Sequence, residues 1–129
     1  MSARDDSDEP RRPRRVYDAG DEPDPRFTLA NERTFLAWIR TSLALMAGGV
    51  AIEAIAAHGQ GSPLRTALAV LLLVAGVGCS TVAFGRWMTT ERALRTGSPL
   101  PPPKLAPALS YGLAVVGLGA CALVLIAEA

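Results

Sequence analysis

Long apolar stretches with almost no charge constrain this sequence most. No charged residue occurs from Thr66 to Gly85 or from Leu105 to Ala127, and a third apolar block, from about Thr34 to Ala57, contains only Arg40 and Glu53. A helix of about 20 residues crosses a hydrocarbon core of about 30 Å. All three blocks are long enough, and the sequence therefore predicts three transmembrane helices.

The predicted fold is an all-α, three-helix polytopic transmembrane bundle preceded by a disordered N-terminal cytoplasmic tail. A soluble bundle is the alternative, but an amphipathic helix in water shows a polar stripe with a period of 3.6 residues. The stretch "TALAVLLLVAGVGCSTVAFG" has no such stripe. We expect a tail over residues 1–23 and a membrane domain over 24–129, with helices at about 27–57, 65–92 and 105–127.

Residues 1–23 combine charges of both signs with prolines and almost no apolar side chains. Such a segment cannot bury enough surface to offset its chain entropy, so we expect disorder. The basic cluster Arg11 to Arg15, "RRPRR", has two interpretations. It binds anionic lipid headgroups, or it is a solvated tail whose arginines are neutralised by nearby acids. The flanking acids favour the second interpretation.

The first long helix has a recognisable start. Asp24 is suited to the N-cap position and Pro25 to the first helical position. Phe27 and Trp38 would contact the membrane at headgroup depth before the helix enters the hydrocarbon core.

Basic residues predict the orientation in the membrane. The N-terminal end of the first helix and the loop between the second and third helices are basic, whereas the opposite side offers only Arg65 and His58. By the positive-inside rule, we expect the N-terminus in the cytoplasm and the C-terminus outside. The basic residues on the predicted cytoplasmic side are Arg26, Arg33, Arg40, Arg86, Arg92, Arg95 and Lys104.

Arg33 and Arg40 are candidate binding residues for anions or lipid phosphates. Seven residues apart on a helix, their side chains point within about 20° of each other, and the same face continues as a row of alanines. In one interpretation, both arginines reach lipid phosphates while the alanines pack against another helix. In the other, several copies assemble and the arginines form rings that attract anions into a pore.

Two acidic residues are further candidates. A carboxylate deep in a membrane helix is costly and is a functional candidate, and this applies to Glu53 if it is buried in the bilayer. Alternatively, the helix ends early and Glu53 lies near the outer headgroups. Glu32, beside Arg33, could form an entrance ion pair with a neighbouring subunit, although exposed pairs contribute little stability.

The sequence indicates no enzyme. It contains no catalytic triad pattern, no phosphate-binding loop and no dinucleotide-binding turn. Cys79 and Cys121 lie inside predicted helices without a CxxC pattern, so neither a disulfide nor a metal site is indicated. We expect no catalytic residue, no metal and no cofactor. The near-zero net charge gives no reason to expect a nucleic-acid partner.

The stretch "DPRFTLANERTFLAWIRTSLALMAGGVAI", followed by two more apolar spans, resembles the YidH-like inner-membrane proteins, domain of unknown function family 202 (DUF202). The resemblance covers about residues 24–127, and "ANERTFLAWIRT" is its specific part. The same domain forms the membrane part of the vacuolar transporter chaperone, a polyphosphate polymerase complex. There, three-helix subunits surround a channel for polyphosphate. The resemblance implies that Arg33 corresponds to a basic position near the channel mouth, but this chain lacks the phosphate-sensing and polymerase domains.

We therefore expect a small membrane protein in the plasma (inner) membrane, with the lipid bilayer and other copies of itself as partners. One hypothesis is an oligomeric subunit or scaffold of undetermined activity. The other is an oligomeric pore that conducts anions such as polyphosphate. A pore requires Arg33 and Arg40 to face a central axis, whereas a scaffold lets both arginines face anionic lipids.

Overall fold

The computed structural model describes residues 11–59 and 61–128, and within these ranges all regular structure is helical. The helices are α1 (Arg14–Tyr17), α2 (Pro25–Ala56), α3 (Pro63–Thr96) and α4 (Leu105–Glu128). The helices expected at 27–57, 65–92 and 105–127 thus have observed counterparts. α2, α3 and α4 are each long and apolar enough to cross a membrane. The all-helical class with three candidate membrane spans is confirmed.

Local sequence explains where the helices begin and end. Asp24 accepts a hydrogen bond from the backbone N–H of Arg26 at 2.9 Å, and Pro25 occupies the first turn of α2. Ser62 and Pro63 begin α3 in the same way, but Ser62 makes no side-chain cap. Gly97 ends α3 in the left-handed conformation at φ 66°, which glycine adopts without a Cβ clash.

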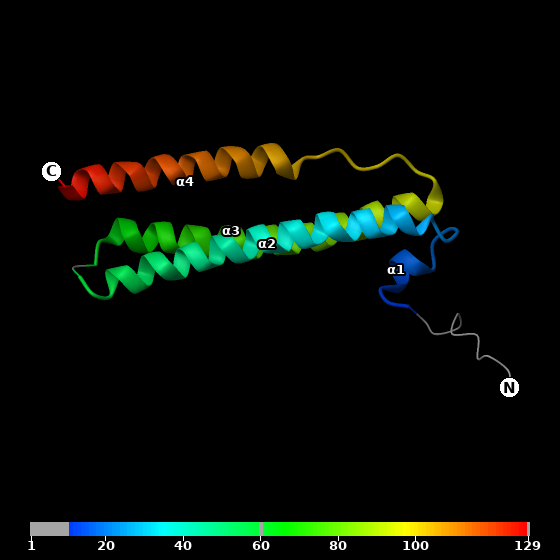
Figure 1. The fold of residues 1–129 in the computed structure, drawn as a ribbon, viewed down its shortest axis with the longest axis horizontal. Coiled ribbons are helices and arrows are strands. Elements are labelled where there is room, and N and C mark those ends of the chain that lie inside the picture. Colours follow the sequence, from blue (N-terminus) through cyan, green and yellow to red (C-terminus); the bar gives the residue numbers. More distant parts are fainter. Residues whose placement is uncertain (1–10, 60, 129) are drawn as a thin grey trace, which may run out of the picture.

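α2 and α3 form an antiparallel hairpin and lie side by side along their length (Figure 1). The contact face of α3 repeats at alternating spacings of three and four residues, the pattern of close left-handed helix pairing. Most of these residues are small, which lets two membrane helices approach each other closely. They are Ala69, Leu72, Gly76, Cys79 and Ala83.

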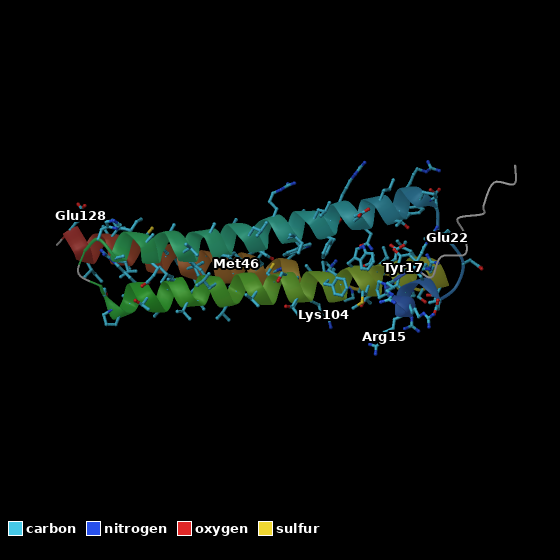
Figure 2. All side chains as sticks on the ribbon, turned by 90° about the horizontal axis from the view of Figure 1, so that it is seen from below. Arg15, Tyr17, Glu22, Met46, Lys104 and Glu128 are labelled. Carbon is cyan, nitrogen blue, oxygen red and sulfur yellow. The ribbon has the colours of Figure 1, made fainter. Side chains whose placement is uncertain are left out.

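Two glycines set the closest approach within the hairpin. A Cβ built on Gly76 would lie 2.6 Å from Met46 Cγ, and one on Gly49 would lie 2.8 Å from the Ala69 carbonyl oxygen. Figure 2 shows Met46 between the two helices. Ser42 is fully buried here, and its hydroxyl donates to the Trp38 carbonyl at 3.0 Å. This part of the hairpin has no room for added side-chain atoms.

α4 runs beside the hairpin but makes only sparse contact with the rest of the described chain (Figure 1). An apolar groove of about 540 Å³ separates it from the hairpin, lined by α3 residues such as Leu71 and Val82 and by α4 residues such as Leu109 and Val116. None of the apolar stretch of α4 is buried within the described structure, and Tyr111 is 76% exposed. The three spans are therefore a tight pair and a loosely placed third helix.

Residues 11–23 of the expected tail lie within the described structure. Residues 14–17 form the helical turn α1, which packs against the end of α3. Val16 is only 1% exposed, so this segment has one apolar side chain that it buries. The preceding residues 1–10 of the expected tail lie outside the described residues.

Candidate functional site

α2 and α3 are longer than a membrane requires. At about 1.5 Å per residue, their 32 and 34 residues extend about 48 and 51 Å, against a hydrocarbon core of about 30 Å. The charge-free part of α3 ends at Gly85, so its last 11 residues, Arg86–Thr96, continue beyond the apolar stretch. Together with the start of α2 they form a polar end of the hairpin, where most functional candidates gather.

A buried carboxylate joins the two helices at this polar end. Glu91 of α3 is 1% exposed. The Thr28 hydroxyl donates to one of its carboxylate oxygens at 2.9 Å, and the Asn31 side-chain amide donates to the other at 3.2 Å. The same Asn31 amide nitrogen also lies 3.2 Å from the Trp87 carbonyl oxygen, to which it donates. Both carboxylate oxygens are thereby satisfied, as a buried polar group requires.

The spacing of these residues explains the cluster. Thr28 and Asn31 are three residues apart on α2, whereas Trp87 and Glu91 are four apart on α3, so each pair lies on one helix face. Sliding α2 along α3 would separate the donors from Glu91. The cluster therefore sets the register of the hairpin.

One helical turn further on, Arg95 attaches the N-terminal segment to α3. Its guanidinium donates to the backbone carbonyls of Ala19 at 3.1 Å and Tyr17 at 3.2 Å, and it lies 5.1 Å from the centre of the Tyr17 ring. In return, the Arg95 carbonyl accepts from the backbone N–H of Asp21 at 3.0 Å. A buried guanidinium with several partners holds the segment in place.

Three aromatic rings mark the boundary between the apolar and polar parts. Phe84 stacks on Trp87 at 6.0 Å between ring centres, and Phe35 of α2 lies edge-on to Phe84 at 6.4 Å. Aromatic side chains concentrate at headgroup depth in membrane proteins. This aromatic cluster therefore indicates where the hairpin leaves the hydrocarbon core.

The predicted arginines lie on a different face of α2 from the Glu91 cluster. Arg33 and Arg40 are both exposed, and so are the alanines that continue their face. Within the described residues, neither arginine lies within ion-pair distance of an acid. The structure therefore does not join them to Glu91. The face they share is open to lipid or to another copy.

The two predicted acidic candidates are also exposed. Glu32 makes no ion pair with Arg33 inside the described chain, so the predicted entrance pair would need a second copy. Glu53 lies in the last turn of α2, where its carbonyl accepts from the Ala57 N–H. That position favours the interpretation in which Glu53 lies near the headgroups opposite the polar end.

The cap at Asp24 has an electrostatic consequence. Hydrogen bonds from the side chain and then from the backbone N–H of Arg26 lower the pKa of the Asp24 carboxyl below its ordinary value. Both bonds favour the ionised form. An ionised carboxylate at a helix N-terminus also interacts favourably with the helix dipole.

The described residues offer no metal centre, since no three potential ligands among His, Cys, Asp and Glu lie together there. Cys79 is buried in the hairpin and Cys121 is exposed on α4, both as free thiols.

Sequence reasoning missed the residues that organise the polar end. Arg95 was predicted only as one of the basic residues of the cytoplasmic side, Asn31 stood only within a quoted motif, and Glu91 was not singled out. One signal in the sequence marks Glu91 and Arg95, although it does not identify the residues that they contact. Trp87, Glu91 and Arg95 recur every four residues, which puts one aromatic and two charged side chains on one face of a helix.

Comparisons with known proteins identify a matching family and similar proteins. Residues 26–93, which include nearly all of α2 and most of α3, match the family described as "Domain of unknown function (DUF202)". An uncharacterized protein of Mycobacterium tuberculosis is 45% identical over 103 residues, which cover 80% of this chain and 84% of that protein. The inner membrane protein YidH of Escherichia coli (strain K12) is 41% identical over 108 residues, 84% of this chain and 94% of YidH. No solved structure matches the chain.

Proposed function

The chain belongs to the DUF202 family and is a small multi-pass protein of the inner membrane; from this premise we propose that it functions as a homo-oligomeric membrane subunit or scaffold with no catalytic activity of its own. The observation that supports this proposal most is the loose third helix. α4 leaves its apolar stretch unburied and faces the hairpin across an open apolar groove. A second copy could supply the helix contacts that the single chain lacks.

The surface of α4 is suited to close helix contact. Cβ atoms built on Gly112, Gly117 and Gly119 would meet nothing within 4 Å in the single chain. Lipid tails are as apolar as leucine side chains, so association of membrane helices depends on close packing at small residues rather than on the hydrophobic effect. These glycines give a neighbouring helix room for such packing.

The test is the oligomeric state of the full chain in lipid nanodiscs, by cryo-electron microscopy or native mass spectrometry. We expect a defined oligomer in which α4 contacts a neighbouring copy. A monomer over the whole accessible concentration range would overturn the proposal. Replacing Gly117 with a bulky residue tests the same contact, because the added side chain should prevent a neighbouring helix from packing closely there.

An anion-conducting pore is the second candidate, and it is favoured by one specific observation. Arg33 and Arg40 are exposed on the same side of α2. Among the described residues, neither arginine lies within ion-pair distance of an acid. In a ring of copies with this face inward, the arginines would attract anions. Flux of short-chain polyphosphate through liposomes would then fall in Arg33→Ala and Arg40→Ala. Both arginines facing lipid in an oligomer map would eliminate this candidate.

We propose that the polar end of the hairpin is cytoplasmic. The antiparallel arrangement of α2 and α3 gathers Arg33, Arg86 and Arg92 at the same end, whereas Arg65 lies at the other. In a variant without native thiols, Ser98→Cys should react with a membrane-impermeant maleimide only after the membrane is opened, and His58→Cys should react in intact cells. The reverse pattern would refute this orientation.

A further inference from the structure

The N-terminal segment, residues 11–23, is held against the hairpin by specific contacts. Val16 is buried, and the guanidinium of Arg95 holds the carbonyls of Tyr17 and Ala19. Gly20 has φ 58°, and a Cβ at this position would collide with the Arg95 carbonyl. The contact between this segment and α3 therefore depends on a glycine as well as on an arginine.

This attachment holds basic side chains beside the end of the apolar stretch. Arg12, Pro13 and Arg14 line an open recess of about 800 Å³ together with Phe84. Phe84 precedes the last residue of the charge-free part of α3, is 46% exposed, and belongs to the aromatic cluster with Trp87. The recess therefore combines cationic side chains and an aromatic ring at the depth of lipid headgroups.

The acids of the described residues pair with only part of the positive charge in this segment. Arg11 pairs with Glu22 at 2.8 Å, but Arg12, Arg14 and Arg15 are exposed and lie beyond ion-pair distance of every acid in the described residues. Figure 2 shows Arg15 extending away from α2 and α3. Three arginines in this position are complementary to a negatively charged surface.

We propose that Arg12, Arg14 and Arg15 form a binding site for the phosphate groups of anionic phospholipids, held at the membrane interface by the contact between residues 16–21 and Arg95. Guanidinium groups form paired hydrogen bonds with phosphate oxygens. Phe84 provides an apolar surface for the part of the lipid below the headgroup. This site lies outside the hairpin contact and is independent of the proposed oligomer.

The experiment is native mass spectrometry of the detergent-purified full chain, titrated with phosphatidylglycerol and, separately, with phosphatidylcholine. We expect preferential binding of phosphatidylglycerol, and about tenfold weaker binding in the triple variant Arg12→Gln, Arg14→Gln, Arg15→Gln. Each basic residue near an anionic surface contributes about fivefold to affinity, so a tenfold loss needs only part of the set. The three side chains are exposed, so their replacement should leave the helical content unchanged.

The matched control removes three positive charges elsewhere at the same end of the molecule. Arg26, Arg92 and Lys104 are exposed and lie outside the recess. Their replacement with glutamine should leave most of the phosphatidylglycerol affinity intact. An equal loss in both triple variants would show that net charge alone is responsible and would overturn the proposal. Competition by inorganic phosphate at the same concentration as the lipid would also overturn it, because the occupant would then be free phosphate.

A third variant keeps every charge and removes only the attachment. Gly20→Val is incompatible with the positive φ and with the adjacent Arg95 carbonyl, so it should release the segment from α3. We expect the affinity for phosphatidylglycerol to fall as it does in the triple glutamine variant. Full retention of affinity in Gly20→Val would show that a free basic tail is sufficient, and the structured site would be refuted.

Discussion

The polar end of the α2–α3 hairpin and helix α4 differ in the contacts that they make within the chain. At the polar end, Glu91 receives a donor at each carboxylate oxygen, and Arg95 reaches two carbonyls and an aromatic ring. Within the part of the chain that the structure describes, α4 makes no comparable contacts: Leu118 is 72% exposed, and a Cβ built on Gly117 or Gly119 would meet nothing within 4 Å. The chain supplies its own partners in the first region but not in the second.

This difference follows from the solvent that each region meets. At the polar end, Glu91 and Arg95 are buried away from water, so their hydrogen bonds must be completed within the chain. An apolar helix face in a bilayer is already solvated by lipid and needs no partner from its own chain. A stable hairpin and an available third helix can therefore coexist in a single short protein. Four predictions test the contacts that hold the hairpin together and the lack of such contacts at α4.

The largest effect is expected from Glu91→Ala. The substitution leaves the Thr28 hydroxyl without an acceptor and the Asn31 amide with only the Trp87 carbonyl. We expect the free energy of unfolding in mixed micelles to fall by about 2–3 kcal/mol, because buried donors lose their acceptor. Glu53→Ala is the control, since Glu53 is exposed and should change stability by less than about 0.5 kcal/mol. Equal effects of the two substitutions would show that the Glu91 cluster does not hold the hairpin.

The next effect concerns close packing within the hairpin and compares two glycines on one helix. A Cβ on Gly76 would lie 2.6 Å from Met46 Cγ and 2.9 Å from the Ser42 carbonyl oxygen, whereas a Cβ on Gly78 would meet nothing within 4 Å. Gly76→Ala should therefore cost about 1–2 kcal/mol of stability through overcrowding. Gly78→Ala should be neutral or slightly stabilising, because alanine has the higher helix propensity. Loss of stability in Gly78→Ala alone would reverse our assignment of the packed face.

Sequence alone was sufficient for the part of the fold that local chemistry decides. Uninterrupted apolar stretches predict the three long helices, and Asp24 followed by Pro25 predicts the start of α2. The polar end depends on contacts between distant residues. Asn31 and Glu91 are 60 residues apart, and Tyr17 and Arg95 are 78 apart, so no local pattern reveals that they meet. For the same reason, the contact of Arg95 with Tyr17 and Ala19 could not be predicted from a sequence in which residues 1–23 have the composition of a charged tail.

The third prediction concerns α4. Gly117→Ile adds bulk to a face that is open in the single chain, so it should leave the stability of the hairpin unchanged. If α4 packs against a neighbouring copy, the same substitution should weaken self-association about tenfold through overcrowding at the contact. Fluorescence energy transfer between labelled copies in liposomes measures that association. Gly85→Ile is the control, because Gly85 is equally open but lies on α3 near the polar end. Unchanged association in Gly117→Ile would exclude this face of α4 from the interface.

The smallest effect separates a capped helix start at the polar end from an uncapped start at the opposite end. Asp24 accepts from the Arg26 N–H, whereas Ser62 makes no side-chain cap before α3. The hydrogen bonds from Arg26 lower the pKa of Asp24 in the folded chain, so its contribution to stability is present above its ordinary pKa and is lost as the pH falls through the lowered value. Amide hydrogen exchange at Arg26 and Phe27 should therefore accelerate at acidic pH, once intrinsic exchange rates are taken into account. Asp24→Asn should remove that pH dependence while keeping a hydrogen-bond acceptor at the cap. Ser62→Ala should leave exchange at the start of α3 unchanged at any pH, and a comparable acceleration there would mean that the two helix starts do not differ.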